Sequence, residues 1–99
     1  MARFDVYRMH GTDGFLIDLQ SDYMDWITTR VVAPLVPLER APMQAKHLNP
    51  VFPIDGREYL MVTQSMAAVP TNALGEVISN LSAQQDAITR ALDMVFQGF

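Results

Sequence analysis

One helical period at the end of the sequence, from Ser82 to Phe99, constrains the fold more than any other feature. Ser82 is followed three residues later by Gln85, which is the spacing of a capping box. The residues that then recur on one helix face are apolar: Ile88, Ala91, Leu92, Val95, Phe96 and Phe99. The opposite face is polar and comprises Asp86, Arg90, Asp93 and Gln97. We therefore predict an amphipathic helix over Ser82 to Phe99.

The end of this predicted helix is unusually apolar. Chain ends are normally polar and frayed, but this sequence finishes Val95-Phe96-Gln97-Gly98-Phe99. We expect Ile88, Leu92 and Val95 to pack on the core, as the apolar stripe of an amphipathic helix usually does. For the Phe99 ring two interpretations stay open. Burial would gain only about 1.5–3 kcal/mol against fraying beyond Gly98, whereas presentation to a partner would use the ring as an aromatic anchor.

The first half of the sequence alternates as β-strands do. The runs Phe4–Tyr7 and Phe15–Leu19 flank a turn-forming stretch at 10–14, which predicts a hairpin with a loop of several residues. The β-branched run Arg30–Val36 predicts a third strand. Prolines close this run, so we expect it at a sheet edge or at a bend. Residues 39–50 lack a clear period and predict a long loop.

The strongest hairpin signal lies in the second half. Asp55-Gly56 separates the apolar runs Val51–Ile54 and Arg57–Thr63, and this dipeptide favours the positive φ angles of a two-residue turn. A further short strand is predicted at Met66–Pro70. The stretch Leu74–Leu81 fits both periods, and we interpret it as a strand. Strands first and a helix last predict a mainly β (α+β) fold, a small antiparallel barrel or sheet with one C-terminal helix.

The connection after the second strand carries large apolar side chains. Tyr23 and Met24 follow the polar turn residues 20–22, and we expect both to be exposed. We expect Trp26 and Ile27 to cover one end of the core instead, because large apolar side chains are usually buried.

Composition limits the possible functions. A hydrophobic content of 49% with 18% charged residues predicts a single folded domain over residues 1–99. The net charge of −4 does not provide the basic face that nucleic-acid binding needs. There is no cysteine, and no apolar run reaches the length of a membrane span. The N-terminal residues alternate in charge and apolarity, unlike a signal peptide, so we expect a soluble cytoplasmic protein.

The residues give no positive sign of an enzyme. His10 and His47 lie in separate predicted loops without further ligands at metal spacing, so we expect neither a metal site nor a cofactor. Phosphate-binding Gly-rich loops, nucleophile elbows and paired catalytic carboxylates do not occur in the sequence. Thr28-Thr29-Arg30 would offer a ribonuclease a hydroxyl and an arginine, but a polar strand entrance is the simpler interpretation.

Several segments, taken in their order and spacing, resemble the CcdB family, the toxins of the ccd toxin–antitoxin modules. These segments are Leu19-Gln20-Ser21-Asp22, Met66-Ala67-Ala68-Val69-Pro70, Leu74-Gly75-Glu76, Leu81-Ser82 and Phe96-Gln97-Gly98-Phe99. The resemblance runs from Phe4 to Phe99. It implies an SH3-like antiparallel β-barrel with one long C-terminal α-helix, assembled as a symmetric homodimer. It also implies a toxin without catalysis of its own, which binds the A subunit of DNA gyrase and traps the cleaved-DNA complex. A disordered segment of a CcdA-like antitoxin would neutralise it.

The resemblance further implies a gyrase-binding site in the connection after the second strand and at the helix tip. The implied site residues are Tyr23, Met24, Asp93, Phe96, Gln97, Gly98 and Phe99. Gln97 stands where the family pattern has a tryptophan that stacks on a gyrase arginine, and an amide offers no aromatic face. Losing such an anchor could cost on the order of 2 kcal/mol or more. Tyr23 and Met24 replace two isoleucines, and Asp93 replaces an asparagine.

Two other functions stay open beside gyrase poisoning. The first is a MazF-like mRNA endonuclease toxin, which shares this fold family and would need Arg30 as its reactive residue. The second is a CcdB homologue that still binds an antitoxin but has lost or changed gyrase poisoning.

Overall fold

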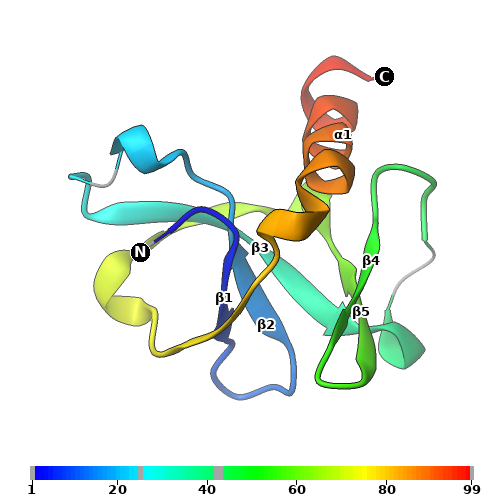
Figure 1. Ribbon diagram of the computed structural model, residues 1–99, viewed down its shortest axis with the longest axis horizontal. Helices are drawn as coiled ribbons and strands as arrows, with labels where there is room; N and C mark the ends of the chain where they lie inside the picture. The colour runs from blue at the N-terminus through cyan, green and yellow to red at the C-terminus, as the bar shows by residue number, and fades with distance from the viewer. Residues whose placement is uncertain (1, 25, 42–43, 99) are drawn as a thin grey trace.

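The computed structural model of the chain describes residues 2–24, 26–41 and 44–98. These residues form seven strands and one α-helix, arranged as a curled antiparallel half-barrel with the helix after the last strand (Figure 1). The strands are β1 (Asp5–Arg8), β2 (Phe15–Asp18), β3 (Thr29–Pro37), β4 (Val51–Ile54), β5 (Arg57–Met61), β6 (Ala67–Pro70) and β7 (Val77–Asn80). The helix α1 spans Gln85–Gln97. The predicted mainly β (α+β) fold class is confirmed.

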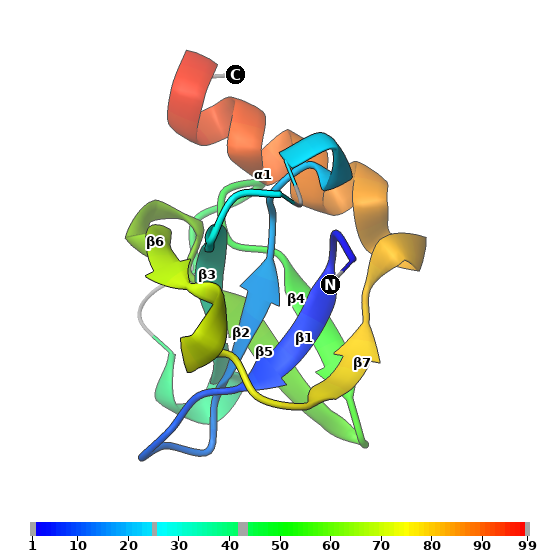
Figure 2. The ribbon, with the colours of Figure 1, turned by 90° about the vertical axis from the view of Figure 1, so that its left-hand side faces the viewer.

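The strands follow the order β4-β5-β3-β2-β1-β7, and β6 also pairs with β3. Figure 2 shows how the sheet curls and how α1 runs across one end of it, with its C-terminal turns extending past the sheet. The first half of α1 closes the core, where Ile88 and Ala91 are fully buried against residues such as Ile17 and Leu35. In the part of the chain that the structure describes, no helix is both long and apolar enough to span a lipid bilayer.

Both predicted hairpins are confirmed. β1 pairs with β2 in a register that places Tyr7 opposite Leu16. In the second hairpin Ile54 lies opposite Arg57, which leaves only Asp55 and Gly56 in the turn. Their φ angles are 52° and 78°, so both occupy the left-handed region that this dipeptide favours. The predicted strands at Met66–Pro70 and Leu74–Leu81 are present as β6 and β7.

Of the two alternatives predicted for the third strand, a sheet edge or a bend, the sheet edge is wrong. β3 is interior, because β2 pairs with one side of it while β6 and β5 share the other. Pro34 is tolerated there because it lies where β3 changes partner, between the β6 pairing that ends at Val32 and the β5 pairing that begins at Leu35. Its carbonyl oxygen accepts a hydrogen bond from the Val62 N–H at 2.9 Å, so the missing proline N–H falls at this junction.

The helix begins later than predicted, and the predicted capping box is not formed. Ser82–Gln84 form a 3₁₀ turn before α1, and neither this turn nor α1 has a side-chain cap at its N-terminus. The Ser82 N–H instead donates to Asn80 Oδ1 at 2.8 Å. An asparagine side chain that bonds the backbone two residues on favours a turn over helix, which delays the helix start. The expected burial of Val95 is also wrong, since this residue is 38% exposed beyond the part of α1 that contacts the sheet.

Candidate functional site

Among the described residues, exposed large apolar side chains gather at two places, while Leu38 and Val77 are exposed singly elsewhere. The first, which we call the η1 surface, consists of Tyr23, Met24 and Trp26 in and after the 3₁₀ turn η1 (Asp22–Met24). Tyr23 is 93% exposed and Trp26 is 77% exposed. The second, which we call the helix tip, consists of residues 93–98, where the Phe96 side chain is 71% exposed. Both places coincide with the segments that the resemblance implies for partner binding.

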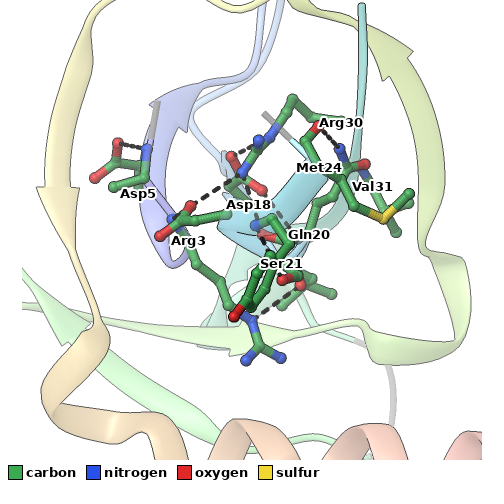
Figure 3. A network of polar contacts seen from close by, with 12 residues as sticks. Arg3, Asp5, Asp18, Gln20, Ser21, Met24, Arg30 and Val31 are labelled. Carbon is green, nitrogen blue, oxygen red and sulfur yellow. Dashed lines mark hydrogen bonds and ion pairs between the residues drawn. The ribbon is translucent and has the colours of Figure 1, made fainter. Parts of the chain in front are cut away.

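A buried amide holds the η1 loop in place (Figure 3). Gln20 Nε2 donates to the carbonyl oxygens of Met24 at 3.2 Å and Thr29 at 3.1 Å. Gln20 Oε1 accepts a hydrogen bond from the Val31 N–H at 3.1 Å. One side chain therefore joins both ends of the η1 loop to β3. Because the Gln20 side chain is buried, these bonds do not compete directly with water.

A buried ion pair lies beneath Gln20. Arg30 Nε donates to Asp18 Oδ2 at 2.8 Å, and the two side chains are 1% and 0% exposed. Arg30 Nη2 also donates to the Gln20 carbonyl oxygen at 3.2 Å, which fixes the backbone where the η1 loop leaves β2. Burial raises the pKa of the Asp18 carboxyl, although the hydrogen bond from Arg30 opposes that rise. The carboxylate in turn raises the pKa of the Arg30 guanidinium despite its burial.

Local hydrogen bonds complete the η1 turn. The Tyr23 N–H donates to Ser21 Oγ at 3.2 Å, and the Met24 N–H donates to the Ser21 carbonyl oxygen at 3.0 Å. Asp22 Oδ1 accepts the Arg3 N–H at 2.9 Å and lies 3.7 Å from Arg30 Nη2. The turn is therefore tied to the chain start, to β2 and to β3, while its aromatic side chain points to solvent.

The helix tip ends in a glycine cap. Gly98 has a φ of 79°, and its N–H donates to the carbonyl oxygens of Asp93 and Met94 at 3.2 Å. This left-handed cap stops α1 after Gln97, which is exposed, and leaves Asp93 half-buried. The α1 residues from Ala91 to Gln97 include no Lys or Arg, so the negative end of the helix dipole has no basic side chain there. Phe99, the last predicted site residue, lies outside the described residues.

Within one chain the two surfaces do not merge. Figures 1 and 2 place η1 and the C-terminal turns of α1 toward the same end of the molecule but separate them in both views. Tyr23 and Met24 are exposed as predicted, but they form one surface while Asp93, Phe96, Gln97 and Gly98 form another. A single partner surface that contacts both would have to be broad.

The residues weighed for catalysis or metal binding are not assembled into such a site. Arg30, the arginine a ribonuclease would need, is 1% exposed and paired with Asp18, so it is not accessible to RNA. His47 Nδ1 lies 3.3 Å from Arg90 Nη1, a cation rather than a metal ligand. Residues 2–24, 26–41 and 44–98 contain no group of three metal-ligating side chains. What the arrangement offers is exposed apolar surface on a fixed backbone, which suits binding to another protein.

The prediction that Trp26 covers the core is wrong, and Ile27 is only half-buried. The sequence does contain a signal that would have corrected it. Trp26 follows a turn and lies outside the alternating strand pattern, in the same loop as Tyr23. The anchoring role of Gln20 left no such signal, because nothing in a polar turn indicates which side chain turns inward.

The half-barrel and its two exposed surfaces define a small α+β protein that presents apolar side chains to solvent. The model of one protein family, described as CcdB protein, matches residues 3–98 of the chain. The chain therefore belongs to the CcdB family, a family of toxins from toxin–antitoxin modules. The resemblance described from the sequence is thereby confirmed.

Proposed function

We propose that this protein is a toxin that binds the A subunit of bacterial DNA gyrase and traps the complex with cleaved DNA. A CcdA-like antitoxin neutralises it. The observation that carries the proposal is that Tyr23 and Phe96 are 93% and 71% exposed, at two positions where the family resemblance implies gyrase contact. Large aromatic side chains are the commonest anchors of protein–protein interfaces. Both occur here on backbone that is held by hydrogen bonds.

The proposed mechanism is binding without catalysis, by a cytoplasmic homodimer. A poison that traps an intermediate needs to bind that intermediate more tightly than the states before and after it. Exposed side chains on a backbone held by hydrogen bonds suit this task, because less backbone entropy is lost when they are covered. The dimer, as implied by the family resemblance, would present two helix tips and two η1 surfaces to the symmetric gyrase.

The decisive experiment is a DNA cleavage assay with purified gyrase. We expect the full chain to increase the amount of cleaved DNA and a chain lacking residues 97–99 to lose this effect. Phe96→Ala should weaken it by about tenfold or more, the loss of an aromatic anchor. Leu38→Ala is the matched control, because Leu38 is also exposed, at 40%, but lies on the separate turn Leu38–Arg40. If the shortened chain stabilises cleaved DNA as well as the full chain, the site is wrong.

A second candidate is a family member that binds its antitoxin but no longer poisons gyrase. Gln97 favours it, because a flexible amide stands where the family pattern has an aromatic anchor. Separate pull-downs of gyrase A subunit and of antitoxin by the same protein distinguish the two functions. Antitoxin binding without gyrase binding would establish the second. The ribonuclease alternative is disfavoured by the burial of Arg30.

A further inference from the structure

We infer that Trp26 belongs to the partner-binding surface and that the η1 surface receives a cationic part of the partner protein, such as an arginine or lysine side chain. This inference rests on the proposed function and adds to it a contact residue and the chemistry of the contact. Trp26 is absent from the site implied by the family resemblance. The structure nevertheless places it 77% exposed, within three residues of Tyr23.

The first support is the concentration of exposed side chains. Single exposed apolar residues are normal on protein surfaces. Here Tyr23, Met24 and Trp26 are exposed at 93%, 42% and 77% within four positions. Two of the three are aromatic, and aromatic residues are enriched where proteins bind one another.

The second support is that the backbone of this surface is fixed before binding. The Ile27 N–H donates to the Met24 carbonyl oxygen at 3.1 Å and closes a turn around Trp26. The same carbonyl oxygen accepts a second hydrogen bond, from Gln20 Nε2, and the Gln20 side chain is buried. Gln20 thus gives the loop a buried polar anchor with three hydrogen bonds. A binding loop gains affinity from it, because less entropy is lost on association.

The third support is charge, which selects the kind of partner. Between Met9 and Thr29 the sequence contains no Lys or Arg. The Asp22 side chain, at the start of η1, is 60% exposed. The first arginine that follows this stretch, Arg30 in β3, is buried at 1% exposure. Exposed aromatic faces beside a carboxylate attract guanidinium and ammonium groups and disfavour phosphate.

Two of the described arginines contact this region. Arg30 lies 3.7 Å from Asp22 Oδ1 but is buried with Asp18. The backbone N–H of Arg3 donates to Asp22 Oδ1, and the Arg3 side chain is occupied elsewhere. Its Nε donates to the Leu19 carbonyl oxygen at 3.2 Å, and its guanidinium carbon lies 4.7 Å from the centre of the Phe4 ring. It stacks on a buried ring rather than on Tyr23 or Trp26. Within residues 2–24, 26–41 and 44–98, the arginines that stack on aromatic rings lie over Phe4 and Tyr59, which leaves the aromatic faces of the η1 surface for a cation from another protein.

Trp26 is the only tryptophan in the sequence, so it can report on its own surroundings. We would incorporate 5-fluorotryptophan, record the single ¹⁹F resonance, and add purified gyrase A subunit at low and at high salt. We expect the resonance to shift or broaden on binding. The affinity should fall severalfold between about 50 mM and 500 mM NaCl, because salt screens contacts between exposed charges.

Two substitutions separate cation recognition from simple apolar burial. Trp26→Phe keeps an aromatic face and should bind within about threefold of the parent protein, whereas Trp26→Leu keeps apolar area without a π face and should bind about tenfold more weakly. Equal binding by Trp26→Leu and Trp26→Phe would overturn the cationic contact. Circular dichroism of both variants checks that the fold is unchanged, as expected for an exposed position.

The possible failures are distinguishable. If gyrase A subunit binds but the ¹⁹F resonance does not respond, this inference is wrong and the proposed function stands. If the resonance responds to protein concentration alone, a second copy of the chain covers Trp26, and the inference is again wrong. If gyrase A subunit does not bind at all, the proposed function fails and the inference fails with it.

Discussion

Gln20 donates a hydrogen bond from its buried Nε2 to the carbonyl oxygen of Met24 at 3.2 Å, so an interior side chain fixes the backbone of an exposed loop. The same Nε2 donates to Thr29 and the amide oxygen accepts from Val31. The η1 surface thus depends on the interior for its shape, and a substitution inside the protein can alter a binding surface that it does not touch.

Gln20→Leu should therefore destabilise the fold and also weaken partner binding. The leucine fills similar space but leaves two carbonyl oxygens and the Val31 N–H without partners. We expect a loss of about 1–3 kcal/mol in the free energy of unfolding, measured by urea denaturation. Gln84→Leu is the control, because Gln84 is exposed. An unchanged midpoint for Gln20→Leu would show that water replaces the amide without loss.

Arg30→Met should be among the most destabilising single substitutions, because it leaves the Asp18 carboxylate buried without its cation. Breaking a buried pair in this way costs about 3–5 kcal/mol. The double variant Asp18→Leu/Arg30→Met should be more stable than Arg30→Met alone, since no buried charge remains. Denaturation of the parent, both single variants and the double variant gives the coupling energy. Additive losses would contradict a direct pair.

The titration of Asp18 should contribute to the pH dependence of the free energy of unfolding. Burial raises the pKa of this carboxyl above its ordinary value of 3.8. Just above that value the folded state holds the proton more tightly than the unfolded state, so the stability contributed by this group falls as the pH rises toward the folded pKa. Unfolding free energies should show the parent losing stability relative to Asp18→Asn as the pH rises above the ordinary pKa of 3.8. The opposite slope would mean that the ion pair outweighs burial.

Two substitutions on α1 should differ sharply although both remove apolar atoms from the same predicted stripe. Ile88 is fully buried, and Ile88→Ala should cost about 2–5 kcal/mol. Val95 is 38% exposed, and Val95→Ala should change the unfolding free energy by about 0.5 kcal/mol or less. Thermal or urea denaturation of the two variants makes the comparison. Equal losses would indicate that Val95 packs as Ile88 does.

Gly98→Ala should loosen the helix tip with little effect on the rest of the fold. A Cβ at this position meets nothing within 4 Å, so the penalty comes only from the φ of 79°. Alanine in the left-handed region costs about 1 kcal/mol. We expect a local rise in amide exchange at the end of α1 and weaker binding of gyrase A subunit. Faster exchange at Ile88 as well would show that the cap supports the whole helix.

Local patterns in the sequence were sufficient to predict both hairpins and the presence of the helix. Asp55-Gly56 and the apolar spacing from Ile88 to Ala91 are local signals. The turn and the helix that they form depend mainly on residues close in the sequence. The interior position of β3 could not be predicted in this way, because it depends on which distant strands pair with it. Pro34 suggested an edge or a bend, and the proline lies at the junction of two partner strands.

The candidate site was predictable only in part. Tyr23 and Met24 follow a polar turn, and their exposure follows from that. Trp26 was assigned to the core because of its size, yet the turn that carries it faces away from the sheet. Arg30 was interpreted as part of a polar strand entrance, whereas its side chain is buried in an ion pair with Asp18. A charge can be buried only if its partner is buried beside it, and that partner lies twelve residues away in the sequence.

β3 is the common neighbour of three other strands, since β6 and β5 lie end to end along one of its sides and β2 lies along the other. Neither β6 nor the β4–β5 hairpin can stay in place if β3 is displaced. The half-barrel is therefore expected to open as one cooperative unit, with the central amides of β3 exchanging with solvent only when the whole chain unfolds.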